Sequence, residues 1–117
     1  MTFDNLLLDR DGPVATITIN RPSALNALNT PTTDDLMHAV EALGADASVR
    51  AVILTGAGEK SFVAGADISE FGGADEGARI TRGFHEALDA VAAIPRFVIG
   101  AVSGYALGGG CELALAC

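Results

Sequence analysis

Residues 97–117 have the sequence FVIGAVSGYALGGGCELALAC, in which a glycine-rich segment separates two apolar runs. The first run, Phe97 to Val102, is short and continuously apolar, which is typical of a buried β-strand. The glycines from Gly104 to Gly110 permit sharp turns and a close approach of backbone to a ligand. The second run, from Cys111 onward, has the character of an apolar helix. The stretch therefore predicts a strand, a turn and a helix in succession.

A second unit of this kind lies immediately upstream. Residues 51–55 (AVILT) form a continuously apolar run that suits a strand buried on both faces, and residues 62–68 suit a further short strand. A helix is predicted over residues 75–94, because Ile80, Phe84, Leu88 and Val91 recur at helical spacing. Pro95 ends this helix.

The N-terminal part predicts a hairpin followed by a helix. Residues 3–8 and 14–19 are strand-like, and Asp11-Gly12-Pro13 supplies turn chemistry between them. Thr30 is expected to cap a helix over residues 31–47. The chain is thus predicted to be one α/β domain, residues 1–117, built from repeated β-β-α units. The last helix lacks a C-cap glycine and a basic last turn, so we expect the chain to be truncated after Cys117.

Composition excludes several classes of function. The formal net charge is −8, which opposes a nucleic-acid or anionic-membrane surface because both need clustered Lys and Arg. The first ten residues lack the pattern of a signal peptide, and the expected location is the cytoplasm. Cys111 and Cys117 have no metal-ligand spacing, so we expect two buried free thiols and no metal site.

The segment Gly108-Gly109-Gly110-Cys111-Glu112 carries the clearest chemical signal. The first amides of a helix have no intrahelical partner and, with the helix dipole, can stabilise a developing oxyanion. A carboxylate beside such a site, here Glu112, is a natural general acid or base. Alternatively, the glycines only allow tight packing and Glu112 only favours the helix N-terminus.

The segment from Phe62 to Ile68 contains a second glycine-bearing turn after a strand. A backbone amide of this turn and one from the Gly109 turn would together form an oxyanion hole. The alternative interpretation is an ordinary tight connection in which Asp67 caps a helix.

Three motifs in this order resemble the enoyl-CoA hydratase/isomerase (crotonase) family. They are Asn20-Arg21-Pro22 with Asn26-Ala27-Leu28, then residues 61–68 (SFVAGADI), then residues 104–114 (GYALGGGCELA). The resemblance covers essentially the whole chain and implies a crotonase-like spiral of β-β-α units that ends before the C-terminal helical trimerisation region. Gly-Gly-Gly-Cys-Glu-Leu points to enoyl-CoA hydratases in particular.

The resemblance also implies site roles. The backbone amides of Ala66 and Gly109 would hold the thioester oxygen of an acyl-CoA, and Glu112 would be one of two catalytic glutamates that handle the added water. The substrate-binding residues are expected to be Ala24, Ala64, Gly65, Ala66, Asp67, Ile68, Ser69 and Gly109. Ser69 stands where relatives often carry a lysine near coenzyme A, so that contact is not expected. No cofactor is required, because coenzyme A is part of the substrate.

The second glutamate of the family pattern would lie beyond Cys117, so the 117-residue chain alone is expected to be inactive. The parent protein is expected to be a homotrimer or hexamer, or part of a multifunctional β-oxidation protein. The resemblance implies that the parent protein is an enoyl-CoA hydratase, which adds water reversibly to trans-2-enoyl-CoA in fatty-acid or related acyl-CoA degradation. Two alternatives remain open: double-bond isomerisation or another enolate-forming reaction of acyl-CoA, and a non-catalytic CoA-binding module if the chain is complete. The second catalytic residue, which would distinguish hydration from isomerisation, would lie beyond Cys117.

Overall fold

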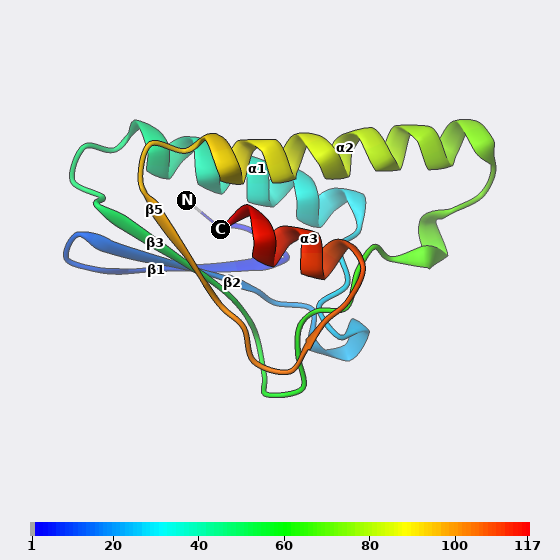
Figure 1. Cartoon of the computed structure of the whole chain (residues 1–117), viewed down its shortest axis with the longest axis horizontal. Coiled ribbons are helices and arrows are strands. Elements are labelled where there is room, and N and C mark those ends of the chain that lie inside the picture. The colour runs from blue at the N-terminus through cyan, green and yellow to red at the C-terminus, as the bar shows by residue number, and fades with distance from the viewer. Residues whose placement is uncertain (1) are drawn as a thin grey trace.

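The computed structural model describes residues 2–117 as a four-stranded sheet, a pair of short strands and three α-helices (Figure 1). The strands are β1 (Leu6–Asp11), β2 (Val14–Ile19), β3 (Ala51–Gly56), β4 (Ser61–Val63), β5 (Phe97–Ala101) and β6 (Tyr105–Ala106). The helices are α1 (Thr30–Ala45), α2 (Ala74–Ala93) and α3 (Gly109–Ala116), with single 3₁₀ turns at η1 (Pro22–Ala24) and η2 (Ile68–Glu70).

The strand order confirms the predicted repeat. The main sheet has the order β1-β2-β3-β5, with β1 antiparallel to β2 and the other neighbours parallel. The short strand β4 pairs in parallel with β6. The unit β3-β4-α2 is therefore followed by β5-β6-α3, and corresponding strands of the two units lie side by side in both sheets. This is the α/β spiral that the sequence predicts.

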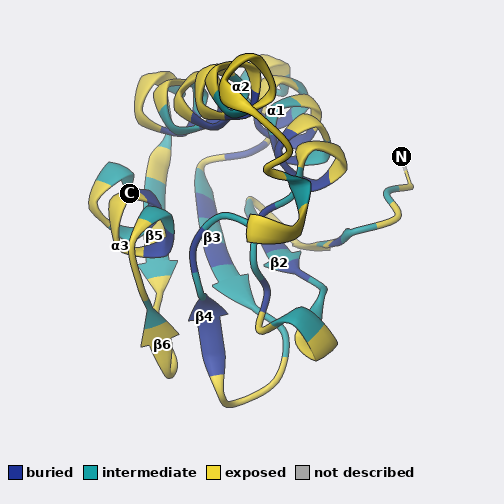
Figure 2. Ribbon diagram, turned by 90° about the vertical axis from the view of Figure 1, so that its right-hand side faces the viewer, coloured by how far each residue is buried: buried dark blue, intermediate teal, exposed yellow. Residues whose placement is uncertain are grey.

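One face of the main sheet forms the core under the helices (Figure 2). On β2 the side chains of Ala15, Ile17 and Ile19 are buried, and on β3 those of Val52 and Leu54. Removal of these apolar surfaces from water is the main force that holds the layers together. The expectation that β3 is buried on both faces is wrong, because Ala51 and Ile53 are only half-buried on the side away from α1 and α2.

Local chemistry moves some element boundaries. β1 runs to Asp11, beyond the predicted residues 3–8, because Gly12, at φ 60°, allows a two-residue turn that pairs Asp11 with Val14. The N-cap of α1 is Asn29, whose Oδ1 accepts a hydrogen bond from the Thr32 amide at 3.0 Å, and not Thr30. The strand predicted over residues 62–68 ends at Val63, and β6 lies in what was predicted to be a turn.

Candidate active site

The glycine-rich turn before α3 leaves the first amide of that helix without an acceptor among the described residues. Gly108 precedes the helix at φ 52° and ψ −117°, a conformation that side-chain-bearing residues avoid. The Gly110 amide donates to the Leu107 carbonyl at 2.8 Å, and the Glu112 amide donates to the Gly108 carbonyl at 3.1 Å. The Gly109 N–H has no backbone acceptor within residues 2–117. It is therefore available to a ligand.

The start of α3 is held between β4 and α2. A Cβ added at Gly110 would overlap the carbonyl oxygen of Val63, and one added at Gly109 would overlap the ring of Phe84. The tight-packing interpretation of the triple glycine is thus correct for Gly110. The same packing fixes the position of the Gly109 amide, so the two interpretations of this motif are compatible.

The second turn presents the amide of Ala66. Leu28 forms a parallel bridge with Ala66: the Leu28 amide donates to the Gly65 carbonyl at 2.8 Å, and the Asp67 amide donates to the Leu28 carbonyl at 2.9 Å. Because these bonds flank Ala66, its own N–H points away from Leu28, and it has no backbone acceptor in the described part of the chain. A Cβ at Gly65 would lie 3.9 Å from the Gly109 nitrogen, so the two turns are adjacent.

A cavity of about 160 Å³ lies where the two turns meet α2. It is lined by Ala66, Gly109 and Glu112, together with Phe71, Ile80, Thr81, Phe84 and His85. Glu112 lies exposed in the first turn of α3. The structure thus brings together the three residues that the sequence nominated for catalysis, and their chemical roles stay predictions.

Asp67 caps η2 and forms an ion pair. Its Oδ1 accepts hydrogen bonds from the Ser69 amide at 3.0 Å and the Ser69 hydroxyl at 2.7 Å, and its Oδ2 lies 3.1 Å from Arg21 Nη2. The hydrogen bonds from Ser69, and then Arg21, lower the pKa of the Asp67 carboxyl. The cap interpretation of Asp67 is therefore confirmed, and Arg21 is added to it.

The other nominated substrate-binding residues do not all reach this cavity. Ala64 is half-buried, and its amide donates to the Leu25 carbonyl at 3.2 Å. Ile68 is 82% exposed and Ser69 is exposed, so η2 offers a surface beside the cavity. Ala24 lies in η1 and bonds within its own turn, and it does not line the 160 Å³ cavity.

Five lining residues were not nominated from the sequence. Ile80 and Phe84 were found only as the apolar face of a helix, and the same periodicity places Thr81 and His85 one position beyond them. Helical periodicity shows that a face is buried, but it does not show which segment lies against it. The contact with Gly109 depends on packing between α2 and α3, which are separated along the chain.

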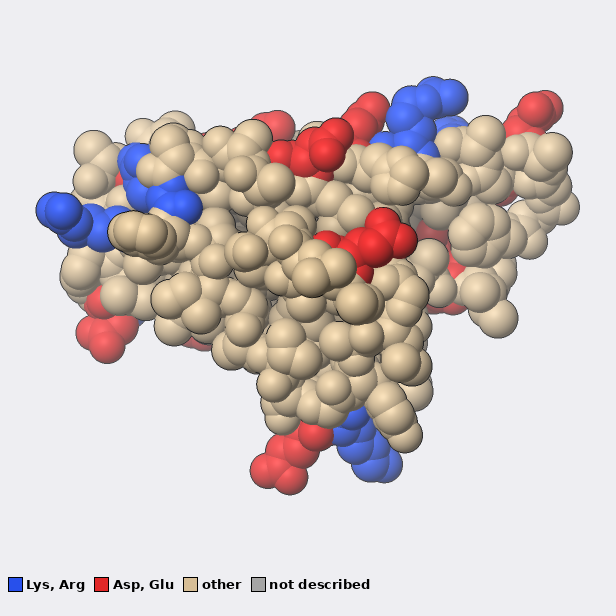
Figure 3. Space-filling model, viewed as in Figure 1, with Lys and Arg blue, Asp and Glu red and all other residues tan. Residues whose placement is uncertain are grey.

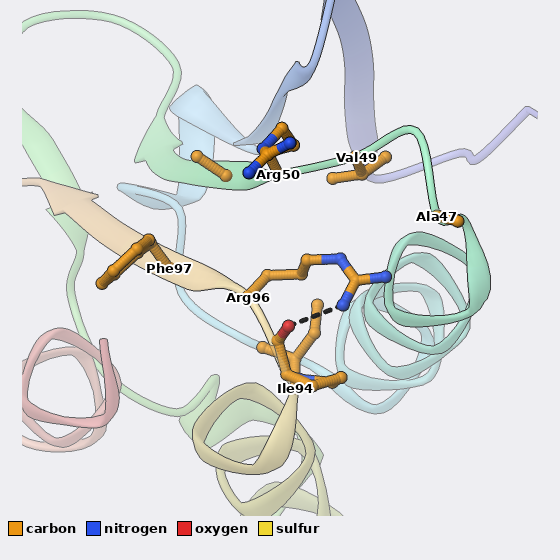
Figure 4. A pocket seen from close by; sticks show the side chains of 8 residues that line it. Ala47, Val49, Arg50, Ile94, Arg96 and Phe97 are labelled. Atoms are coloured by element: carbon orange, nitrogen blue, oxygen red, sulfur yellow. Dashed lines mark hydrogen bonds between the residues drawn. The ribbon is translucent and has the colours of Figure 1, made fainter.

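A larger cavity lies away from these residues (Figure 4). It has a volume of about 790 Å³ and is lined by the start of β3 and the connection from α2 to β5, including Arg50, Arg96 and Phe97. The Arg96 guanidinium donates to the carbonyls of Gly44 and Asp46, at 3.3 Å and 3.2 Å, and so satisfies the C-terminal end of α1. None of the residues expected to bind substrate lines this cavity, and Arg96 holds the end of α1 through these hydrogen bonds.

The cysteines differ from expectation. Cys111 is exposed and Cys117 half-buried, so the prediction of two buried thiols is wrong for Cys111 and only partly met by Cys117. Burial raises the pKa of the Cys117 thiol. Both thiols are free.

Charge and metal-binding potential are dispersed. Within residues 2–117 no group of three or more His, Cys, Asp or Glu side chains could hold a metal ion. In Figure 3, Asp and Glu side chains are scattered among separated Lys and Arg side chains on the face shown. Among the described residues, the helices are too short or too polar to cross a membrane.

Comparison with known proteins identifies the family. The model of the enoyl-CoA hydratase/isomerase family matches residues 9–117. The chain belongs to this family. It is 47% identical over its whole length to the short-chain-enoyl-CoA hydratase of Clostridium acetobutylicum and covers 46% of that protein. It is 41% identical to the crotonyl-CoA hydratase of Syntrophomonas wolfei, again with all of this chain and 46% of the relative aligned.

Solved structures show the same fold. An enoyl-CoA hydratase from Bacillus anthracis superposes on 97% of this chain with a TM-score of 0.95 and 36% identity, and the match covers 45% of that structure. The predicted crotonase-like fold is thereby confirmed. The chain spans less than half the length of these relatives, and the activity of the whole protein is taken up below as a proposal.

Proposed function

We propose that the protein carrying this chain is an enoyl-CoA hydratase that adds water reversibly to trans-2-enoyl-CoA thioesters. The observation that carries the proposal is the meeting of two unpartnered amides, those of Ala66 and Gly109, with the Glu112 carboxylate at one cavity. Membership of the enoyl-CoA hydratase/isomerase family and the names of the relatives support it.

The two amides match the charge that the reaction develops. When water attacks the β-carbon of an enoyl thioester, electron density moves onto the thioester oxygen and an enolate forms. Donors fixed by packing stabilise that oxygen more in the transition state than in the ground state, which lowers the barrier. Both donors are held by structure before substrate binds, since Gly109 is packed against Phe84 and Ala66 is bridged to Leu28.

Glu112 is placed to move a proton. It lies in the turn that follows the Gly109 amide and lines the same cavity. As a base it would take a proton from the water that attacks the β-carbon, and the enolate would then accept a proton at its α-carbon, which completes the addition of water. In the reverse reaction the α-proton leaves and Glu112 would return its proton to the departing hydroxyl. Coenzyme A would lie along the turn formed by residues 64–69, whose exposed member Ile68 offers apolar surface.

The test is the hydration of crotonyl-CoA, a short substrate of the class named for two relatives. Loss of ultraviolet absorbance of the conjugated thioester reports the reaction. Glu112→Gln keeps the size of the side chain and removes the base, so kcat is expected to fall by about 10²–10⁴. Glu41→Gln, an exposed carboxylate on α1, is the matched control. Equal rates for the two variants would refute the assignment.

A second candidate is double-bond isomerisation, which the description of the family includes. One carboxylate above an oxyanion hole is sufficient to move a proton along an acyl chain, whereas hydration also needs a positioned water. Reaction in ¹⁸O-labelled water separates the two, because hydration incorporates the label at the β-carbon and isomerisation incorporates none.

A further inference from the structure

The segment from Asn20 to Leu28 contains two residues with positive φ and is held in place by hydrogen bonds of a buried side chain. Leu25 and Asn26 have φ values of 53° and 59°, which are uncommon for residues other than glycine. Asn26 is completely buried; its Oδ1 accepts from the Arg21 amide at 3.0 Å, and its Nδ2 donates to the carbonyls of Ala57 at 3.0 Å and Ser61 at 2.9 Å. Such strain persists only where surrounding contacts over-determine it. The segment therefore acts as a rigid support.

Arg21 connects this support to the Ala66 turn. One end of its guanidinium donates to the Ala27 carbonyl, and the other lies 3.1 Å from Asp67 Oδ2. Ala27 and Asp67 are the neighbours of Leu28 and Ala66, which form the bridge. Both charged side chains are 18% exposed, so water screens the pair less than it screens a surface pair. Arg21 thus clamps the bridge from one side.

The direction of the Ala66 N–H follows from these contacts. The Ala66 nitrogen and the Gly65 carbonyl belong to one planar peptide unit, and in a trans peptide the N–H and C=O point in opposite directions. The Gly65 carbonyl accepts from Leu28, so the Ala66 N–H is held toward the cavity side. Gly65 itself, at φ 98°, has little side-chain resistance to rotation. The Leu28 amide restrains this peptide through the Gly65 carbonyl, and Asp67 adds restraint on the other side of Ala66.

We propose that the Arg21–Asp67 ion pair is a positioning pair that holds the Ala66 amide in line with the thioester oxygen. This inference rests on the oxyanion role proposed above. Loss of the pair loosens the Gly65–Ala66 peptide and weakens stabilisation of the enolate. The Asp67 carboxylate is occupied by Arg21 and Ser69, so the backbone and the exposed surface of the turn would still meet coenzyme A. The expected signature is a lower kcat at nearly constant KM.

The chain contains its own matched control. Asp46 pairs with Arg10 at 3.1 Å and accepts hydrogen bonds from the Ser48 amide and hydroxyl, as Asp67 does from Ser69, but no nominated residue contacts it. The experiment compares Asp67→Asn with Asp46→Asn in crotonyl-CoA hydration by the full-length protein that carries this chain, after thermal unfolding shows that each variant is folded. Arg21→Lys is the second variant at the site, since lysine keeps the charge but cannot bond Ala27 and Asp67 together.

Asp67→Asn is expected to lower kcat by about 10–100-fold, with KM changed by less than about three-fold, because small misplacements of catalytic groups have effects of this size. The kcat of Arg21→Lys should lie between those of Asp67→Asn and the wild type, and the kcat of Asp46→Asn should equal that of the wild type. In parallel, the ¹³C resonance of a thioester-labelled butyryl-CoA reports carbonyl polarisation in the complex. Asp67→Asn should reduce the downfield shift that binding produces in the wild type.

The hydration kinetics and the carbonyl ¹³C shift together distinguish failure of the positioning role from failure of the hydratase proposal. An unchanged carbonyl shift in Asp67→Asn, or a rise in KM with kcat intact, overturns the positioning role. Absence of hydration by the wild type with a normal carbonyl shift that Asp67→Asn reduces would refute the hydratase proposal and support the positioning role. A wild-type complex with no carbonyl shift would overturn both.

Discussion

Two regions of this molecule carry nearly the same group of side chains. Asp46 and Ser48 with Arg10 form one, and Asp67 and Ser69 with Arg21 form the other. In each, the carboxylate is 3.1 Å from the guanidinium and accepts from the serine amide, at 2.9 Å and 3.0 Å respectively. The hydrogen bonds from serine are the largest cause of the lowered pKa of both carboxyls.

The surroundings of the two groups differ. The side chains of Arg10 and Asp46 are 37% and 42% exposed, and they lie near the starts of β2 and β3; Arg21 and Asp67 are each 18% exposed and lie beyond the ends of these strands. Of the two groups, only the second adjoins the turn whose Ala66 lines the cavity shared with Gly109 and Glu112. An Asp-x-Ser turn paired with an arginine therefore occurs twice in this chain as a structural motif. Its relevance to catalysis depends on the residues that it positions, which for Asp67 include Ala66.

Breaking the support beneath Asp67 should have the largest effect. Asn26→Gly removes the three hydrogen bonds of a fully buried side-chain amide. Because glycine tolerates φ 59°, the loss of stability reports the lost hydrogen bonds and not a strained backbone. Loss of the Asn26 hydrogen bonds to the buried Ser61 carbonyl and the half-buried Ala57 carbonyl is expected to lower the free energy of unfolding by about 3 kcal/mol. Urea denaturation measures it. Ser48→Ala, in the exposed group, is the control, and equal losses for the two would contradict the account.

The glycine of the other donor provides the next test. Gly109→Ala places a methyl group against the Phe84 ring and should displace the amide, lowering kcat by about 100-fold. Gly44→Ala, near the Asp46 group, meets Ile94 Cγ1 at 3.3 Å and should leave kcat unchanged. Phe84→Leu shortens the ring edge, so adding it to Gly109→Ala should recover part of the loss. Failure of the double variant to exceed Gly109→Ala would show that the clash with Phe84 is not the cause.

Lowering the pH should have a smaller effect, a difference in how the stabilities of Asp67→Asn and Asp46→Asn change with pH. Because the pKa of Asp67 is lowered from 3.8 on folding, its contribution to stability is complete above that value and is lost as the pH falls through the lowered folded pKa. Asp67→Asn should therefore lose stability at neutral pH and show a weaker decline below about pH 4 than the wild type. Asp46→Asn should follow the wild type more closely, because its pair is more exposed. Denaturation midpoints from neutral pH to about pH 2 test this, and identical profiles would count against the difference in burial.

Local patterns in the sequence were sufficient for most of the fold. Alternation in residues 14–19 and helical spacing in residues 75–94 depend on neighbouring residues, and both elements formed as predicted. The boundaries of β1 and α1 shifted because they depend on the pairing at Gly12 and the cap at Asn29. Long-range contacts could not be predicted in this way. The role of Arg21 depends on Asp67, and the position of Phe84 depends on Gly109.

The site followed from motif chemistry more than from pattern. A glycine-rich turn before a helix predicts free amides by elementary geometry, and Gly109 and Glu112 were found in this way. Ala66 was nominated by resemblance, and the bridge to Leu28 now explains why its amide is free. Exposure was predicted poorly: Phe97 was placed in a buried strand but is 80% exposed, because the described residues cover only one face of β5.

The amides of Ala66 and Gly109 are proposed to bind the same thioester oxygen. The most direct test is a titration of the ¹⁵N-labelled chain with butyryl-CoA, which has no double bond to hydrate, observed by NMR. If both amides bind that oxygen, both amide proton resonances move downfield with a common dissociation constant, while the resonance of the Ser48 amide does not move. Movement of Ser48 and its neighbours with Ala66 and Gly109 unchanged would contradict it.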